Sequence, residues 1–123
     1  MDKQLFIIGA LSGMLSVALG AFGTHAMRGR VAPQVLNTFE TGLRYEIYHA
    51  FAILAVALAM THWSSGLLVY AGWAFVAGTI LFSGSLYLLV FTGRRAFGAV
   101  TPFGGIAFIA GWLLLALGVG QSG

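Results

Sequence analysis

The chain has 123 residues, of which 59% are hydrophobic and 7% are charged. Soluble domains carry about one quarter charged residues, so this composition excludes a water-soluble domain and predicts an integral membrane protein. The net charge of +3 does not indicate a nucleic-acid partner, because the Arg residues stand in pairs beside apolar segments instead of forming a long basic stripe. The absence of cysteine excludes disulfides, thiolate metal sites and cysteine nucleophiles.

The first predicted helix covers residues 5–26, which is enough for a segment that needs roughly 20 residues to cross a bilayer. We do not expect a signal peptide here, because the apolar part is too long and Asp2 beside Lys3 makes a poor basic start. Gly9 and Gly13 stand four residues apart in this segment. Small residues at this spacing let membrane helices approach closely, so we expect them to hold helices together.

The second predicted helix covers residues 34–61 and follows Pro33, a residue favoured in the first helical turn. It contains the polar stretch ETGLRYEIYHAF, residues 40–51. The wholly apolar part from Ala50 to Met60 would be about 16 Å long, which is too short for a hydrocarbon core of about 30 Å. The helix therefore has to bring part of the polar stretch into the membrane.

This polar stretch carries the candidate site. Most of its polar residues fall on one broad face of the helix at 100° per residue. Glu40 precedes Arg44 by four positions, which is the order that favours a helical ion pair. Ionisable groups within a membrane are costly and indicate function by default. The candidate binding residues are those of the stretch together with the histidine that ends the first helix: His25, Glu40, Arg44, Tyr45, Glu46, Tyr48 and His49.

Different roles are open for these residues. In the simplest one, Glu46 and His49 bond to neighbouring helices and only fix the helix register. In another, Glu46, His49 and His25 form a path for protons or ions. The Glu-x-x-His spacing is also used in di-iron bundles, but such a site needs two copies and two further Glu, and this chain has one copy. We therefore expect no metal and no cofactor.

The basic residues give a further alternative, a site for anionic lipid headgroups near one membrane boundary. The residues concerned are Arg28, Arg30, Arg44, Arg94 and Arg95. Four of them lie in the connections after the first and third helices, where they are also topology signals. The positive-inside rule predicts that both Arg-containing loops lie in the cytoplasm and both termini lie outside.

The third and fourth predicted helices cover residues 67–91 and 102–120, the last one beginning at Pro102 in the motif TPFGG. The connections are short, so neighbouring helices should be antiparallel. The continuous apolar runs exclude a β-barrel, whose strands alternate. The predicted fold class is all-α: an integral membrane four-helix antiparallel bundle that forms a single transmembrane domain over residues 1–123.

Motifs in all four segments resemble a known family. GAFGTHA at 20–26, TGLRYEIYHA at 41–50, FSGSLYLL at 82–89 and TPFGG at 101–105 look like the YwdK/YgdD-type family of uncharacterised small bacterial inner-membrane proteins, which has small eukaryotic transmembrane relatives. The resemblance implies a four-helix protein of the bacterial cytoplasmic (inner) membrane and implies no activity.

The resemblance also bears on individual site residues. It extends to His25, Tyr45 and His49, while family members usually have Gln where this chain has Glu46, and the charge at Arg44 is not a constant feature of the family. A mechanism that depends on a carboxylate at Glu46 is therefore weakened. A hydrogen-bonded polar cluster fits the family pattern better than acid–base chemistry.

These observations favour a non-enzymatic, multi-pass membrane protein. We expect it to bind or conduct a lipid headgroup or small solute at the polar cluster of the second helix. The alternative is an accessory subunit that packs on a larger membrane complex, and a membrane enzyme ranks third because the sequence has no phosphate-binding Gly loop, HExxH motif or nucleophile elbow. The expected partners are the lipid bilayer, anionic headgroups, and a second copy or a membrane complex.

Overall fold

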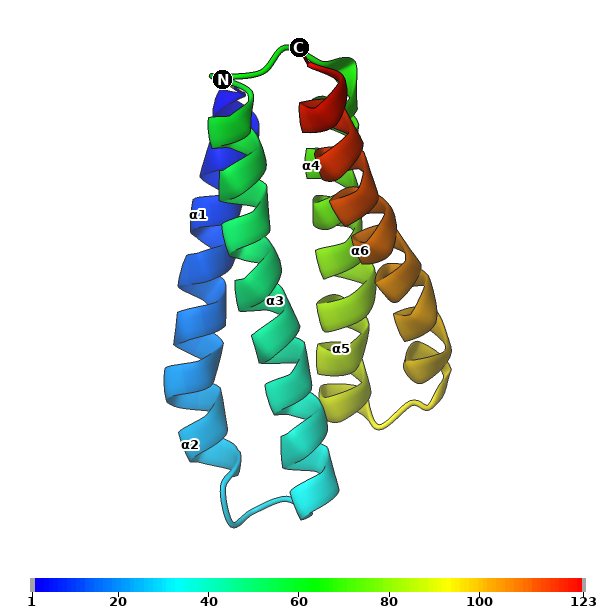
Figure 1. Ribbon diagram of the computed structural model, residues 1–123. Helices are drawn as coiled ribbons and strands as arrows, with labels where there is room; N and C mark the ends of the chain where they lie inside the picture. The colour runs from blue at the N-terminus through cyan, green and yellow to red at the C-terminus, as the bar shows by residue number, and fades with distance from the viewer. Residues whose placement is uncertain (1, 123) are drawn as a thin grey trace.

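The computed structural model describes residues 2–122, which are almost entirely helical (Figure 1). Over these residues four helical spans are long and apolar enough to cross a membrane, as predicted. The elements in chain order are α1 Lys3–Ala18, the π-helix η1 Leu19–Gly23, α2 Thr24–Met27, α3 Pro33–Ala59, α4 Gly66–Gly78, the π-helix η2 Thr79–Gly84, α5 Ser85–Thr92 and α6 Ala96–Gln121. The predicted all-α fold class is confirmed.

Local sequence explains where the helices begin and end. The Asp2 side chain caps α1 by accepting a hydrogen bond from the Leu5 N–H at 3.2 Å, and Ser65 caps α4 in the same way. Pro33 opens α3, where its missing N–H costs nothing. Gly93 ends α5 with a φ of 71°, a left-handed conformation that glycine adopts without a side-chain clash.

The start of the fourth helix differs from the prediction. The sequence predicted that this helix begins at Pro102, but α6 begins at Ala96 and Pro102 lies inside it. The turn signal is Gly93 instead, and the apolar residues after it must satisfy their backbone groups within a helix. Proline leaves the Gly98 carbonyl without its usual N–H donor. The helix continues through this one missing bond.

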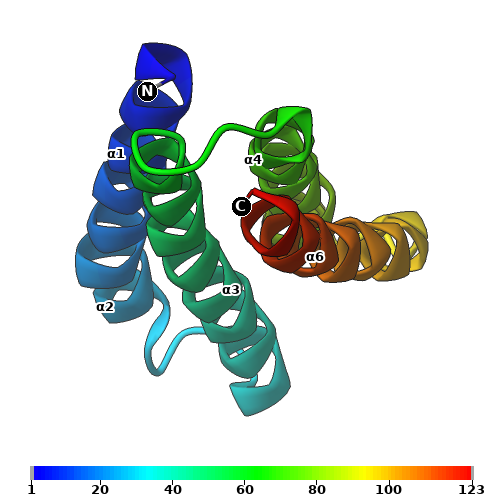
Figure 2. The same ribbon diagram turned by 45° about the horizontal axis from the view of Figure 1, so that its top comes forward.

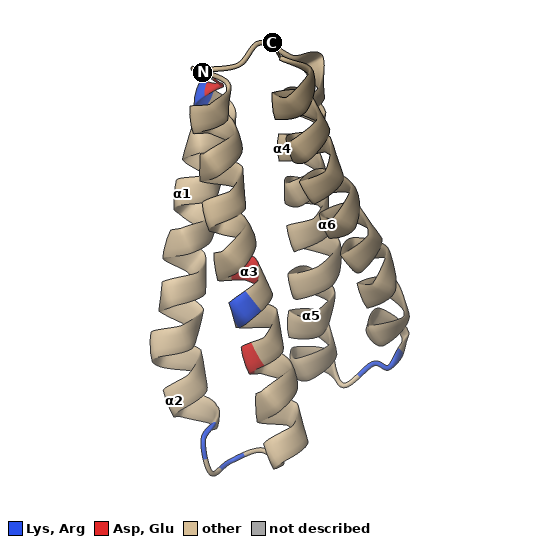
Figure 3. Ribbon diagram, viewed as in Figure 1, with Lys and Arg blue, Asp and Glu red and all other residues tan. Residues whose placement is uncertain are grey.

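Neighbouring helices are antiparallel, and both views show the same pairs side by side (Figures 1 and 2). The helix α1 runs along α3, and α4 runs along α6. These pairs meet where α3 packs against α4, η2 and α5. Both termini lie at one end of the molecule, and the connections that carry the Arg pairs lie at the other (Figure 3).

Glycines bring α4 and α6 into close contact. A Cβ atom built on Gly78 would overlap the Phe108 ring, and one on Gly111 would lie 2.6 Å from Phe75. These aromatic rings belong to the buried core, which α1, α3, α4 and α6 share. In α1, Gly9 faces Leu54, whereas a Cβ on Gly13 would meet nothing within 4 Å. Gly9, Gly78 and Gly111 therefore pack inside the bundle, and Gly13 does not.

Candidate functional site

Glu46 lies at the point where the helices of the bundle meet. Glu46 stands near the middle of α3 and is only 3% exposed. One carboxylate oxygen accepts a hydrogen bond from Ser12 Oγ of α1 at 3.0 Å. The other accepts from the Tyr87 hydroxyl of α5 at 2.7 Å. The carboxylate thus links α3 to a helix on each side.

The hydrogen bonds of Glu46 come, within residues 2–122, from hydroxyl groups and not from Lys or Arg. A carboxylate has about four acceptor positions, so capacity remains for a further donor. A buried charge is stable only when it is paired and well hydrogen-bonded. The site therefore suits a ligand that brings a hydrogen-bond donor or a positive charge.

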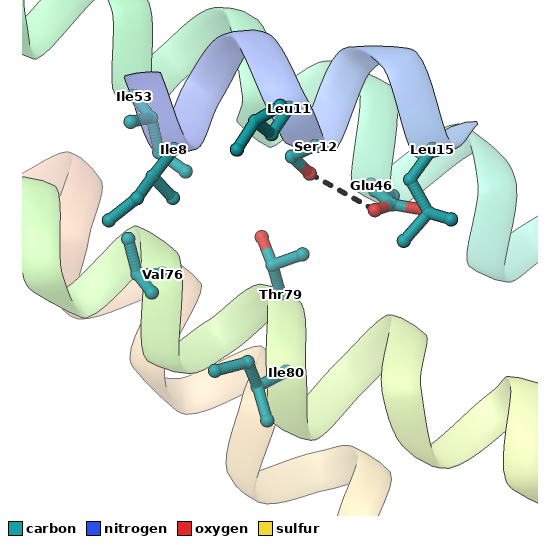
Figure 4. A pocket seen from close by; sticks show the side chains of 9 residues that line it. All are labelled: Ile8, Leu11, Ser12, Leu15, Glu46, Ile53, Val76, Thr79 and Ile80. Atoms are coloured by element: carbon teal, nitrogen blue, oxygen red, sulfur yellow. Dashed lines mark hydrogen bonds between the residues drawn. The ribbon is translucent and has the colours of Figure 1, made fainter. Parts of the chain in front are cut away.

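A groove of about 300 Å³ runs beside Glu46 (Figure 4). The polar side chains in its lining are Ser12, Glu46 and Thr79, and the rest of the lining is apolar. In Figure 4, Ser12 and Glu46 share one wall, and Thr79 points toward them from the facing helix. The lining residue Ile80 is 65% exposed, so the groove opens toward the lipid-facing surface.

The wall opposite Glu46 includes the start of η2. Thr79 and Ile80 are its first residues, and π-helical turns within α-helices are frequent at functional sites. The Thr79 hydroxyl donates to the Phe75 carbonyl at 2.9 Å. Further along, Ser83 donates to the Gly42 carbonyl of α3 at 2.7 Å. Hydroxyl groups thus satisfy backbone carbonyls around η2 and hold it against α3.

His49 lies one turn further along α3, 5% exposed, and faces α6. Its ring stacks on Phe108 with centroids 3.5 Å apart and an angle of 8°. Trp112 Nε1 donates to His49 Nε2 at 3.1 Å. Because an indole only donates, Nε2 is an acceptor. Nδ1 therefore carries the proton and donates it to the Tyr45 carbonyl oxygen, which lies 2.8 Å from Nδ1. The imidazole is therefore neutral, and both nitrogens are occupied.

Of the remaining candidates of the second helix, Tyr45 lies beside His49, and Tyr48 and Arg44 are exposed. Tyr45 stacks on Phe82 at 4.5 Å between centroids, and its centroid lies 6.2 Å from that of His49. Tyr48 is 54% exposed on the outer face of α3. Arg44 is exposed, and its guanidinium donates to Thr41 Oγ1 at 3.2 Å, one turn back on the same helix. The predicted broad face is thus divided between buried and lipid-facing positions.

Glu40 and His25 lie nearer the end of the molecule that carries the Arg loops. Glu40 is half-buried on α3, six residues before Glu46. His25 is exposed on α2. Ser12 bonds to Glu46, and His25 follows Ser12 by 13 residues along the first helical span, which is roughly 20 Å. The structure does not join His25 to Glu46 and His49.

The residues whose side chains bond to Glu46 and His49 were not among the predicted site residues. They are Ser12, Tyr87 and Trp112, with Thr79 on the facing wall of the groove. One feature of the sequence could have identified them: each is a polar side chain within an apolar segment. Hydrogen-bonding groups in such a segment must find partners inside the protein. The same signal marks Ser16 and Ser85, so it does not single out the site.

Comparison with known proteins finds relatives along most of the chain. A family model described as "Protein of unknown function (DUF423)" matches residues 19–105. The UPF0382 membrane protein YwdK of Bacillus subtilis is 42% identical over 114 residues, which is 92% of this chain and 93% of that protein. The UPF0382 inner membrane protein YgdD of Escherichia coli K12 is 40% identical over 117 residues, 95% of this chain and 89% of that protein. No solved structure matches the chain.

Proposed function

The chain belongs to the DUF423 family of proteins of unknown function, and from its site we propose a non-enzymatic membrane protein that binds a lipophilic amine beside Glu46. The family membership confirms the resemblance drawn from the sequence motifs, and the names of the relatives confirm a membrane protein. The observation that carries the proposal is a buried carboxylate in the wall of an otherwise apolar groove.

The chemistry of the groove supports this class of ligand. Its volume of about 300 Å³ is at the lower end of the range for small-molecule pockets, which are mostly apolar with a few placed polar groups. Side chains such as Leu11 and Val76 suit a hydrocarbon chain. An ammonium group would supply both the charge and the hydrogen-bond donor that Glu46 can still accept. The ligand enters sideways from the bilayer.

The test uses full-length protein in detergent micelles, with decylamine as the probe and decanol as an uncharged probe of the same chain length. Native mass spectrometry measures how much of each is retained. We expect Glu46→Gln to weaken decylamine binding about tenfold or more, equivalent to about 1.4 kcal/mol. Decanol binding should persist, because a Gln side chain can still accept from Tyr87 and donate to Ser12.

The matched control is Glu40→Gln, which removes the same charge from the same helix outside the groove lining. It should leave both probes bound as before. Ile80→Trp, at the mouth of the groove, should reduce the binding of both probes. The proposal is wrong if Glu40→Gln and Glu46→Gln weaken decylamine equally, or if decylamine binds no better than decanol.

We also propose an orientation in the membrane and, as a second candidate function, an accessory role in a larger complex. Both Arg-containing loops are assigned to the cytoplasm by the positive-inside rule, and their position at one end of the molecule supports a shared side (Figure 3). An accessory subunit is supported by the open position of Gly13, where small residues commonly form helix contacts. A stoichiometric second protein retained in mild detergent would favour that role.

A further inference from the structure

A second hollow lies at the end of the molecule that carries the Arg loops, away from the Glu46 groove. It has a volume of about 310 Å³ and lies between the start of α3 and the end of α5. Its apolar lining includes Val35, Leu89 and Val90, and its polar lining includes Gln34 and Arg95. The hollow thus has a hydrocarbon-like floor and a cationic edge, at the end where the chain leaves its membrane-spanning segments.

The edge of this hollow favours an anion. Arg95 directly precedes α6, and Gln34 is the second residue of α3, so two helix amino ends with their partial positive charge adjoin the hollow. The carboxyl end of α5 also borders the hollow, and its partial negative charge opposes that of the two amino ends. The net positive charge of the edge therefore comes from the Arg95 guanidinium.

The acidic side chains of the protein do not oppose this charge. The sequence contains three, Asp2, Glu40 and Glu46. Asp2 caps α1 at the opposite end of the molecule, and Glu46 bonds to Ser12 and Tyr87. Glu40 lies about 140° around α3 from Val35, so it points to a different side of the helix. Arg94, next to Arg95, adds further positive charge.

We propose that this hollow binds the phosphate of an anionic phospholipid, with Arg95 and Gln34 holding the phosphate and Val35, Leu89 and Val90 contacting the first part of an acyl chain. A guanidinium can bind a phosphate with two parallel hydrogen bonds. The apolar floor distinguishes a lipid from a free phosphate, which would make no use of it. The site is separate from the proposed amine groove and does not depend on it.

The experiment offers phosphatidylglycerol or phosphatidylcholine with identical acyl chains to full-length protein in detergent micelles. Native mass spectrometry counts the lipids retained. We expect phosphatidylglycerol to be retained about tenfold more strongly, and Arg95→Gln to remove most of that preference. Glycerol phosphate without acyl chains should bind far more weakly than the lipid, because it cannot contact the floor.

Arg94→Gln and Arg28→Gln are the matched controls, since each removes one positive charge from the same end of the molecule without touching the lining. Both should keep most of the preference, and Val35→Trp should abolish it by filling the hollow while leaving every charge in place. The proposal fails if all three Arg substitutions have the same effect, because the preference would then come from general surface charge. It also fails if Val35→Trp has no effect or if glycerol phosphate binds as well as the lipid.

Discussion

Glu46 shows how one side chain can connect several membrane helices. Its two oxygens accept from Ser12 on α1 and Tyr87 on α5, so its position on α3 constrains both neighbours. A Gln at this position, as the family resemblance implies for relatives, could make the same pair of bonds. The hydrogen-bonding role therefore does not require the charge, whereas the proposed binding of an amine does.

Tyr87→Phe tests the structural part of this role. The ring still packs on Phe39, but Glu46 loses a donor. We expect a loss of stability of about 1 kcal/mol, within the range measured for side-chain hydrogen bonds in membrane proteins. Thermal unfolding in detergent measures it, with Tyr70→Phe at an exposed position of α4 as the control. An equal loss in both variants would contradict the importance of the Tyr87 bond.

His49 was predicted as a binding residue, with bonding to neighbouring helices as the simplest alternative. Its nitrogens bond to Trp112 and Tyr45, and its ring lies on Phe108. These contacts fasten α3 to α6. Substitution of His49 should therefore disturb helix packing first, which makes it a poor probe of ligand binding.

At the scale of the helices, glycines decide how closely α4 and α6 approach. We expect Gly78→Leu to prevent this packing, because even a Cβ atom there overlaps Phe108. Gly13→Leu should be tolerated, because a Cβ atom built there meets no other part of the protein within 4 Å. The yield of monodisperse protein and its unfolding temperature measure the difference. Equal behaviour of the two variants would mean that α4 and α6 do not meet through Gly78.

This contrast also separates packing from partner binding. Gly78 cannot report on a partner, since its substitution disrupts the bundle itself. Gly13 can, because its replacement leaves the described interior unchanged. Loss of a co-purifying protein in Gly13→Leu, with the fold intact, would support the accessory role.

At the scale of the whole molecule, the arrangement places both Arg-containing connections at one end and both termini at the other (Figure 3). The proposed orientation can be tested because the natural chain has no cysteine. We expect Ser64→Cys to react with a membrane-impermeant maleimide added outside intact cells. Ala32→Cys, in an Arg-containing loop, should react only after permeabilisation. The opposite labelling pattern would show that the Arg-containing loops lie outside and both termini lie in the cytoplasm.

The class of the protein, its spans and its all-helical fold followed from the sequence alone. A chain with low charge and long apolar runs can adopt few structures, because backbone groups in a membrane must form their hydrogen bonds within a helix or a closed barrel. The start of α6 was missed because Pro102 is typical of a first turn, although the left-handed turn actually falls at Gly93.

The partners of the polar residues were decided only by the tertiary structure. Helical periodicity gives the direction of Glu46 and His49 around α3, but not what stands opposite. Ser12, Tyr87 and Trp112 are separated from their partners by 34, 41 and 63 residues, and no local rule relates such distant positions. The packing of α1, α5 and α6 around α3 brings these groups together, and the space left between α1 and α4 forms the groove beside the carboxylate.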